Sequence, residues 1–155
     1  MVSRINYCNS TLAGTPARLQ NRLQAVLNSA ARLIYSARRH GHITMILCEF
    51  HWLRIPERVT FKVCTLVYRC LEGTAPPCLS ELLQRFILVI ARSRLRSAST
   101  VELVVPASRR STLGDGSFSV AGPRTWNSLS AHVRSSSSLS AFRRELKTFL
   151  LASCF

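Results

Sequence analysis

The chain has 155 residues, of which 47% are hydrophobic; this size and composition fit one domain with a core and exclude wholesale disorder. Lysine and arginine together number 21 against 7 acidic residues, which gives a net charge of +14. Lys62 and Lys147 are the only lysines, and arginine, whose planar guanidinium pairs two donors with a phosphate, supplies the rest. Folding does not need this surplus, because self-repulsion opposes compaction. We therefore expect a polyanionic partner, most commonly nucleic acid, with a codon bias toward arginine and serine as the alternative explanation.

The first predicted helix follows Thr15, which we expect to cap it, with Pro16 at the first helical position. The basic pair Arg38-Arg39 followed by Gly41 predicts the end of this helix, because cations and a glycine both favour a helix C-terminus. Apolar residues recur between these ends at helical spacing, and we expect them to face inward: Leu19, Leu23, Val26, Leu27, Ala30, Leu33 and Ile34.

A helix over residues 56–71 is the element around which the fold is expected to form. Pro56 favours its first turn, and Gly73 can adopt the left-handed conformation that ends a helix. A short helix over 44–50 and an extended link over 52–55 precede it, and the large apolar groups of the link are expected to fill a gap between helices. Apolar residues cover most of the circumference of the central helix, so other elements must enclose it. One narrow stripe is expected at the surface as a basic edge: Arg58, Lys62, Thr65 and Arg69.

The middle of the chain is harder to assign. A short helix is predicted after Pro76-Pro77, and the uncharged run FILVIA at 86–91 fits either a buried strand or a helix end. Residues 92–116 form a basic loop region rich in Ser and Thr. Alternating apolar residues predict a short β-hairpin that pairs 101–105 with 117–121, after which Gly122-Pro123 opens a short helix.

The last helix has the clearest pattern. A Ser-rich linker over 134–138, flexible by composition, precedes it, and Ser138 is its expected cap. Its apolar and basic faces comprise Leu139, Phe142, Leu146, Phe149 and Leu150 on one side and Arg143, Arg144 and Lys147 on the other. The elements together predict a single domain over 1–155 that is mainly α, a small helical bundle around helix 56–71 with one short β-hairpin.

Catalytic signatures are missing from the sequence. Asp115 is the only aspartate, whereas two-metal phosphoryl transfer needs several convergent carboxylates. The sequence has no phosphate-binding Gly-rich loop ending in Gly-Lys-Ser/Thr and no Gly-x-Ser-x-Gly elbow. None of the six cysteines forms a Cys-x-x-Cys pair, so a zinc site has little support. We therefore expect no enzyme activity, no catalytic residues, no metal and no cofactor.

The sequence also bears on location. It shows no secretory apolar segment, and the central helix is too short and too charged to cross a membrane. We interpret the six cysteines as reduced thiols of an intracellular protein, in the nucleus or cytoplasm, that is not secreted and has no membrane partner.

Six sequence blocks carry a family resemblance. In chain order they are INYCNSTLAGTP, RLQNRLQAVLNSAARLIY, HITMILCEFHWLRIPERVTFKV, LVYRCLEGTAPPCLSELL, GDGSFSVAGPRTWNSL and LSAFRRELKTFL. The chain resembles, from about residue 5 to residue 150, the C-terminal region of the reverse-transcriptase polyprotein of non-LTR (LINE-class, Jockey-like) retrotransposons. It departs from that pattern in two places. FILVIARS stands where the family has a more polar linker that contains proline, and Ser130 stands where the family usually has proline.

The resemblance implies that the polymerase palm, with its metal-binding aspartates, and the endonuclease would lie upstream of Met1. The present chain would then follow the palm, where polymerases place a thumb-like helical region on the template–primer duplex. The parent polyprotein would be an RNA-directed DNA polymerase, and this chain a non-catalytic accessory fragment of it. Its expected partners are the backbone of RNA or DNA and the upstream polymerase domains of a full-length element.

Nine arginines are the predicted nucleic-acid-binding residues, and they would contact phosphates with little base specificity. They are Arg38, Arg39, Arg92, Arg94, Arg96, Arg109, Arg110, Arg143 and Arg144. Aromatic residues are few and lie mostly in apolar stripes, so base stacking is not predicted. The alternative is a decayed mobile-element relic, or a helical protein-interaction fragment with no selected function, that exposes apolar surface once covered by the palm.

Overall fold

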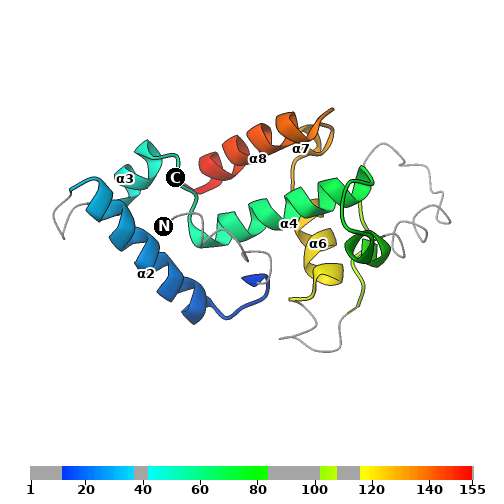
Figure 1. Cartoon of the computed structure of the whole chain (residues 1–155), viewed down its shortest axis with the longest axis horizontal. Helices are drawn as coiled ribbons and strands as arrows, with labels where there is room; N and C mark the ends of the chain where they lie inside the picture. The colour runs from blue at the N-terminus through cyan, green and yellow to red at the C-terminus, as the bar shows by residue number, and fades with distance from the viewer. Residues whose placement is uncertain (1–11, 37–41, 84–101, 108–115, 155) are drawn as a thin grey trace.

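The computed structural model describes residues 12–36, 42–83, 102–107 and 116–154, and all regular secondary structure in these ranges is helical (Figure 1). A helical stretch over 77–83 lies between α4 and α6. The prediction of a mainly α bundle is confirmed. The other helices, in chain order, are α2 (Ala17–Ile34), α3 (Ile43–Glu49), α4 (Ile55–Leu71), α6 (Phe118–Asn127), α7 (Ala131–Arg134) and α8 (Leu139–Cys154).

Helix α4 lies across the middle of the molecule, with α6 and α8 packed along it (Figure 1). Helix α8 runs antiparallel to α4, as its two ends show. Near the end of α4, the Tyr68 hydroxyl donates a hydrogen bond to the backbone oxygen of Ser136, just before α8 (3.1 Å). Cys154, the last residue of α8, lies beside Arg54 at the start of α4. The bundle predicted around helix 56–71 is thus confirmed, and Gly73 ends α4 with a φ of 68° as expected.

Three aromatic side chains join α4, α6 and α8. Tyr68 and Phe142 stack with ring centroids 4.5 Å apart, and Trp126 packs against Phe142 at 5.7 Å. All three are buried, with Phe142 fully removed from solvent. Offset and tilted aromatic pairs of this kind add to the stabilisation that burial alone provides.

The predicted β-hairpin is wrong. Residues 118–121 begin helix α6, in which Val120 and Ala121 are buried. Residues 102–107 form no strand, and Leu103 pairs instead with a side chain: the Asn127 amide donates to the Leu103 carbonyl (2.7 Å) and accepts from its N–H (2.9 Å). One asparagine therefore satisfies both backbone groups that a partner strand would have paired.

Gly122 and Pro123 lie inside α6 and do not open it as predicted. A Cβ atom on Gly122 would stand only 3.2 Å from Cγ2 of Val67. The glycine is therefore explained by the close approach of α6 to α4, and not by a turn.

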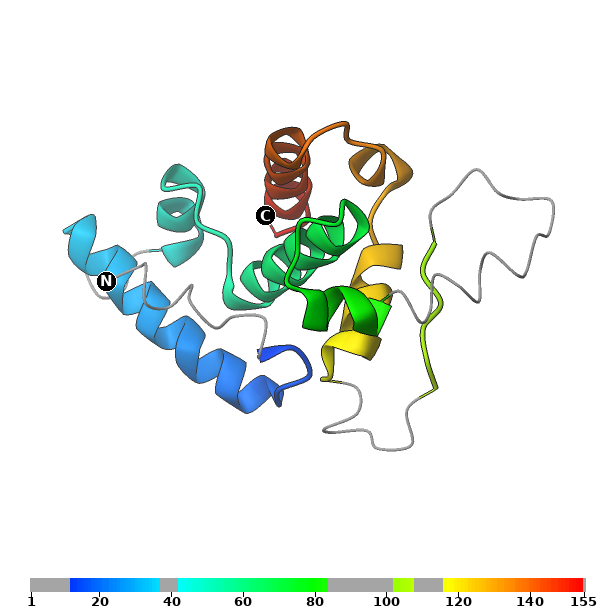
Figure 2. The ribbon, with the colours of Figure 1, turned by 45° about the vertical axis from the view of Figure 1, so that its right-hand side comes forward.

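Helix α2 is confirmed, but much of its predicted inward face is not. Leu27 and Ala31 are fully buried, whereas Leu19, Val26, Leu33 and Ile34 are exposed. The reason is that α2 makes its main helix contacts with α3 and α4 and lies apart from the rest of the bundle as an arm (Figure 2). The residue preceding α2 is Pro16, so the capping prediction for Thr15 is wrong; the Thr15 hydroxyl bonds back to the Leu12 oxygen (2.8 Å).

The arm is fixed to the bundle through the extended link. The Gln24 side-chain oxygen accepts a hydrogen bond from the Ile55 N–H (2.8 Å), one of the donors that the N-terminus of α4 leaves unpaired. Trp52 and Phe50 pack against a small second core of Ala31, Ile46 and Leu47. The prediction that apolar groups of the link fill a gap between helices is confirmed.

The last helix follows its prediction closely. The Ser138 hydroxyl accepts a hydrogen bond from the Ala141 N–H (3.2 Å), as an N-cap does. Phe142, Leu146 and Leu150 are buried. Arg143, Arg144 and Lys147 are exposed.

The predicted helix end at 38–41 is wrong, because α2 ends at Ile34 and the chain turns at Tyr35 and Ser36, the latter with a left-handed φ of 51°. Two other predictions lie on residues outside the described ranges, namely the FILVIA run at 86–91 and most of the basic loop at 92–116. In the part of the chain that is described, no helix combines the length and apolar character that crossing a membrane requires.

Cys64 lies on α4 in the main core. Because its thiol is buried, we expect the protein to lose stability at alkaline pH. Burial raises the pKa of its thiol from 9.0 to about 12. The folded chain then retains a proton that the unfolded chain releases, so the stabilisation is complete below pH 9 and is lost as pH rises toward 12. We expect the free energy of unfolding, measured with urea, to fall more steeply in this range for the wild type than for Cys64→Ala. Parallel pH profiles for the two proteins would contradict the assignment.

Candidate nucleic-acid interface

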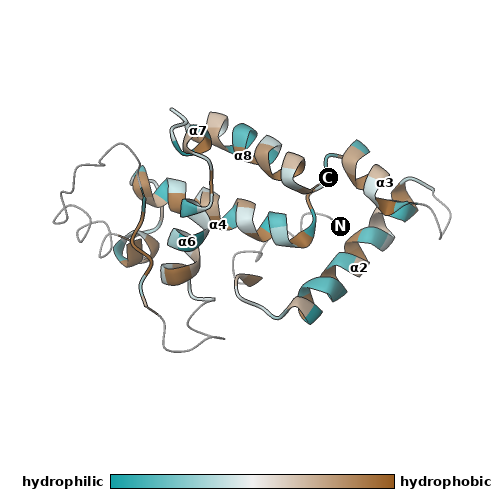
Figure 3. Cartoon of the chain, turned by 180° about the vertical axis from the view of Figure 1, so that it is seen from behind, coloured by the Kyte–Doolittle hydropathy of each residue, from teal (hydrophilic) through white to brown (hydrophobic). Residues whose placement is uncertain are grey.

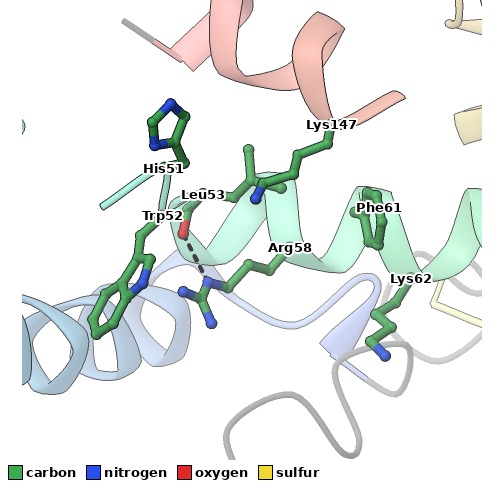
Figure 4. A pocket seen from close by; sticks show the side chains of 7 residues that line it. All are labelled: His51, Trp52, Leu53, Arg58, Phe61, Lys62 and Lys147. Atoms are coloured by element: carbon green, nitrogen blue, oxygen red, sulfur yellow. Dashed lines mark hydrogen bonds between the residues drawn. The ribbon is translucent and has the colours of Figure 1, made fainter. Parts of the chain in front are cut away.

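A groove of about 330 Å³ lies where the link after α3, the first half of α4 and helix α8 meet (Figure 4). Three cationic side chains, one imidazole and three apolar side chains line it. We call it the basic groove, and its residues are His51, Trp52, Leu53, Arg58, Phe61, Lys62 and Lys147.

Helix spacing explains how α4 and α8 contribute to the groove. Arg58, Phe61 and Lys62 are separated by three and four residues and therefore share one side of α4. On α8, burial of Leu146 and Leu150 against the core leaves Lys147 at the edge of the packed face, from which its side chain reaches toward Leu53 (Figure 4). Both lysines of the chain thus line the same groove.

Arg58 is the most buried cation of the groove, with 8% of its surface exposed. Its Nε donates a hydrogen bond to the Leu53 backbone oxygen (2.7 Å), and its guanidinium carbon lies 5.7 Å from the centroid of the Trp52 ring. This distance is in the range of a cation–π interaction. Burial lowers the pKa of Arg58, but a guanidinium stays protonated in proteins, so the groove keeps this positive charge.

The predicted basic edge of α4 is therefore only partly at the surface. Arg58 and Thr65 are buried, and Thr65 satisfies its hydroxyl with the Phe61 carbonyl oxygen (2.7 Å). Lys62 and Arg69 are half-buried. The prediction was wrong for Arg58 because the link over residues 51–53 folds onto it.

The link takes its direction from His51, which has a φ of 51°. This left-handed conformation is uncommon outside glycine and turns the chain sharply after α3. The Trp52 N–H then donates to the Leu47 oxygen (2.8 Å), and the Trp52 ring packs on Phe50 with centroids 5.4 Å apart. Trp52 is thereby placed between Phe50 and Arg58, beside the groove.

The electrostatic character of the groove is uniformly positive or neutral. No aspartate or glutamate lines it among the residues that the structure describes. Within those same ranges, no carboxylate forms an ion pair with Lys62 or Lys147. Positive charges that line one groove, such as those of Lys62 and Lys147, raise the local concentration of anions.

Two of the nine predicted binding residues can be placed. Arg143 and Arg144 are exposed on α8, four and three residues before Lys147, so all three share one basic side of the helix. This basic side of α8 leads directly into the basic groove. The other seven, which the structure does not bring into view, are Arg38, Arg39, Arg92, Arg94, Arg96, Arg109 and Arg110, all outside the described residues.

Sequence reasoning did not select the groove residues as a site. The helical pattern predicts a basic surface edge for Lys62 and Arg58, and the apolar character of Trp52 predicts a packed link. One signal was available: the chain has only two lysines, and both lie on helices with strong amphipathic patterns.

Comparisons of the chain with protein-family models, curated proteins and solved structures found no match. In the described part of the chain, no three side chains of the His, Cys, Asp and Glu types gather as metal ligands would.

Proposed function

We propose that this chain binds the sugar–phosphate backbone of RNA or DNA, without sequence specificity and without catalysis, through the basic groove and the basic side of α8. The observation that carries the proposal is the convergence of Arg58, Lys62 and Lys147 on one groove that no described carboxylate lines. We place this activity inside the cell, in the nucleus or cytoplasm.

The arrangement suits phosphates better than base edges. Lys62 and Lys147 are point charges on flexible stems, which neutralise phosphates but carry little sequence information. Arg143 and Arg144 extend the positive surface along α8, so a polyanion leaving the groove can continue along the helix. Neutralised phosphates release counterions, which supplies the free energy of nonspecific binding.

The family resemblance is part of the same proposal. We infer that the chain is a C-terminal, non-catalytic fragment of a non-LTR retrotransposon reverse transcriptase, with upstream polymerase domains as a further partner. All seven groove residues fall within two of the quoted blocks, HITMILCEFHWLRIPERVTFKV and LSAFRRELKTFL. The sequence blocks and the charge of the groove thus support one interpretation.

The proposal predicts binding that depends on salt. Fluorescence anisotropy of a labelled duplex and a labelled single strand should show binding at about 20 mM salt and loss of binding well above physiological ionic strength, where exposed charges are screened. Heparin, another polyanion, should compete. Absence of binding to both nucleic acids at low salt would contradict the proposed function.

A specific observation also favours the alternative of a helical protein-interaction fragment. Leu19, Val26 and Leu33 are exposed by 45%, 50% and 81% and recur every seven residues on α2, where polar and apolar residues alternate along the helix (Figure 3). Such a stripe can pack against another helix. If it does so between copies of this chain, sedimentation equilibrium will show association, and the triple variant Leu19→Gln, Val26→Gln, Leu33→Gln will abolish it. A wild-type chain that stays monomeric at high concentration would count against self-association.

A further inference from the structure

We infer that the basic groove receives one unpaired nucleotide, with its base against Phe61 and Leu53 and its two flanking phosphates at Lys62 and Lys147. The chain would then prefer single-stranded nucleic acid to duplex. This inference rests on the proposed function and adds to it the form of nucleic acid that the site selects.

The walls of the groove contain apolar as well as cationic side chains. A site for phosphates alone needs only cations on an open surface, but this groove also contains Trp52, Leu53 and Phe61. A volume of about 330 Å³ is at the small end for ligand pockets, which run from about 300 to 1,000 Å³. It therefore suits one ring system with its phosphate and not a stacked pair of bases.

The groove has two aromatic rings, Trp52 and Phe61, and they differ in how they could accept a base. Trp52 is occupied by Phe50, at 5.4 Å between ring centroids, and by the guanidinium of Arg58, at 5.7 Å. Phe61 is half-buried and lies between Arg58 and Lys62 on the same side of α4 (Figure 4). Phe61 is therefore the ring on which a base would stack, and Trp52 contributes its edge.

The cations of the groove lie next to the Phe61 ring. Phe61 and Lys62 are consecutive residues of α4, so a nucleotide whose base covers Phe61 brings its phosphate close to Lys62. Lys147 reaches the same groove from α8, and Arg58 adds a positive charge at its buried end. A base within a duplex is paired and stacked on both sides, so it cannot occupy the groove without being extruded.

Three ligands with the same number of phosphates test the inference: a short single strand, the same strand with abasic sites throughout its centre, and a duplex of matched phosphate count. We expect the wild-type chain to bind the base-bearing strand about fivefold or more tightly than the abasic strand, because base–aromatic stacking contributes at least that factor. Equal affinity for the base-bearing and abasic strands would overturn the inference.

Phe61→Leu provides the matched variant, because it removes the ring and keeps an apolar side chain in the partly buried position. We expect it to weaken binding of the base-bearing strand only, so that the base-bearing and abasic strands become equivalent. Uniform weakening of all three ligands by a variant with an unchanged melting temperature would contradict the role of Phe61. If the variant does not fold, the comparison of strands on the wild-type chain decides alone.

The two levels of the proposal fail in different ways. If none of the three ligands binds at low salt, nucleic-acid binding itself is refuted. If all three bind equally and Lys62→Gln with Lys147→Gln weakens each of them, backbone binding stands and the nucleotide pocket is refuted.

Discussion

Phe142→Ala is expected to lower the free energy of unfolding by about 3–5 kcal/mol, the usual cost of deleting a fully buried aromatic side chain. Phe142 has no exposed surface and contacts Tyr68 and Trp126, so it joins α8 to both α4 and α6. Small domains have total stabilities of only about 5–15 kcal/mol, so the variant should lose a large part of its stability and unfold at a markedly lower urea concentration than the wild type.

Urea denaturation followed by circular dichroism measures this effect, and Phe149→Ala is the matched control on the same helix. Phe149 is only half-buried at the margin of the core, so its loss should cost clearly less. A stability loss below about 1 kcal/mol for Phe142→Ala would mean that the three-helix junction does not hold the fold together.

The double variant Lys62→Gln, Lys147→Gln is expected to bind nucleic acid about tenfold or more weakly than the wild type, because charge-assisted hydrogen bonds contribute more than neutral ones and 1.4 kcal/mol corresponds to a factor of ten. Lys62 is half-buried and Lys147 exposed, and neither takes part in the core clusters. The melting temperature should therefore change little.

Arg18→Gln with Arg22→Gln is the matched control for charge. These arginines are exposed on α2 and do not line the basic groove. Their replacement removes two positive charges, as many as the double lysine variant loses. We expect an affinity within about threefold of the wild type, because distant surface charges are screened by salt. Equal losses in the two double variants would show that net charge, and not the basic groove, determines binding.

Local signals explain which elements the sequence predicted correctly. Helix α4 has a proline in its first turn and Gly73 just after its end, and α8 has a serine cap and a complete apolar face. These features act within a few residues along the chain, so they are visible without the fold.

The mistakes in the sequence predictions arose where two patterns fit the same residues. Phe118 and Val120 alternate as residues of a strand would, yet they also fit the first turn of a helix. The structure forms the helix, α6, in which Gly122 packs closely on Val67. Helical periodicity likewise predicted α2 but could not show that only Leu27 and Ala31 would be fully covered.

The basic groove was not predictable because it depends on residues distant in sequence. Arg58 becomes buried only when Leu53 and Trp52 fold over it, and Lys147 reaches the same place from the far end of the chain. Spacing within α4 and α8 gives the direction of each cation, but only the packing of the two helices brings them together. The exposed position of Arg143 and Arg144 on α8 was predictable, because the basic side of a single helix is a local feature.

The dependence of duplex affinity on salt tests most directly the claim that the groove cations contact phosphates. The slope of log affinity against log salt should be shallower for Lys62→Gln, Lys147→Gln than for the wild type by about 1.8, since each lost phosphate contact removes about 0.9. The slope of the Arg18→Gln, Arg22→Gln control should equal that of the wild type. A wild-type slope near zero, or an unchanged slope after both groove lysines are replaced, would contradict the account.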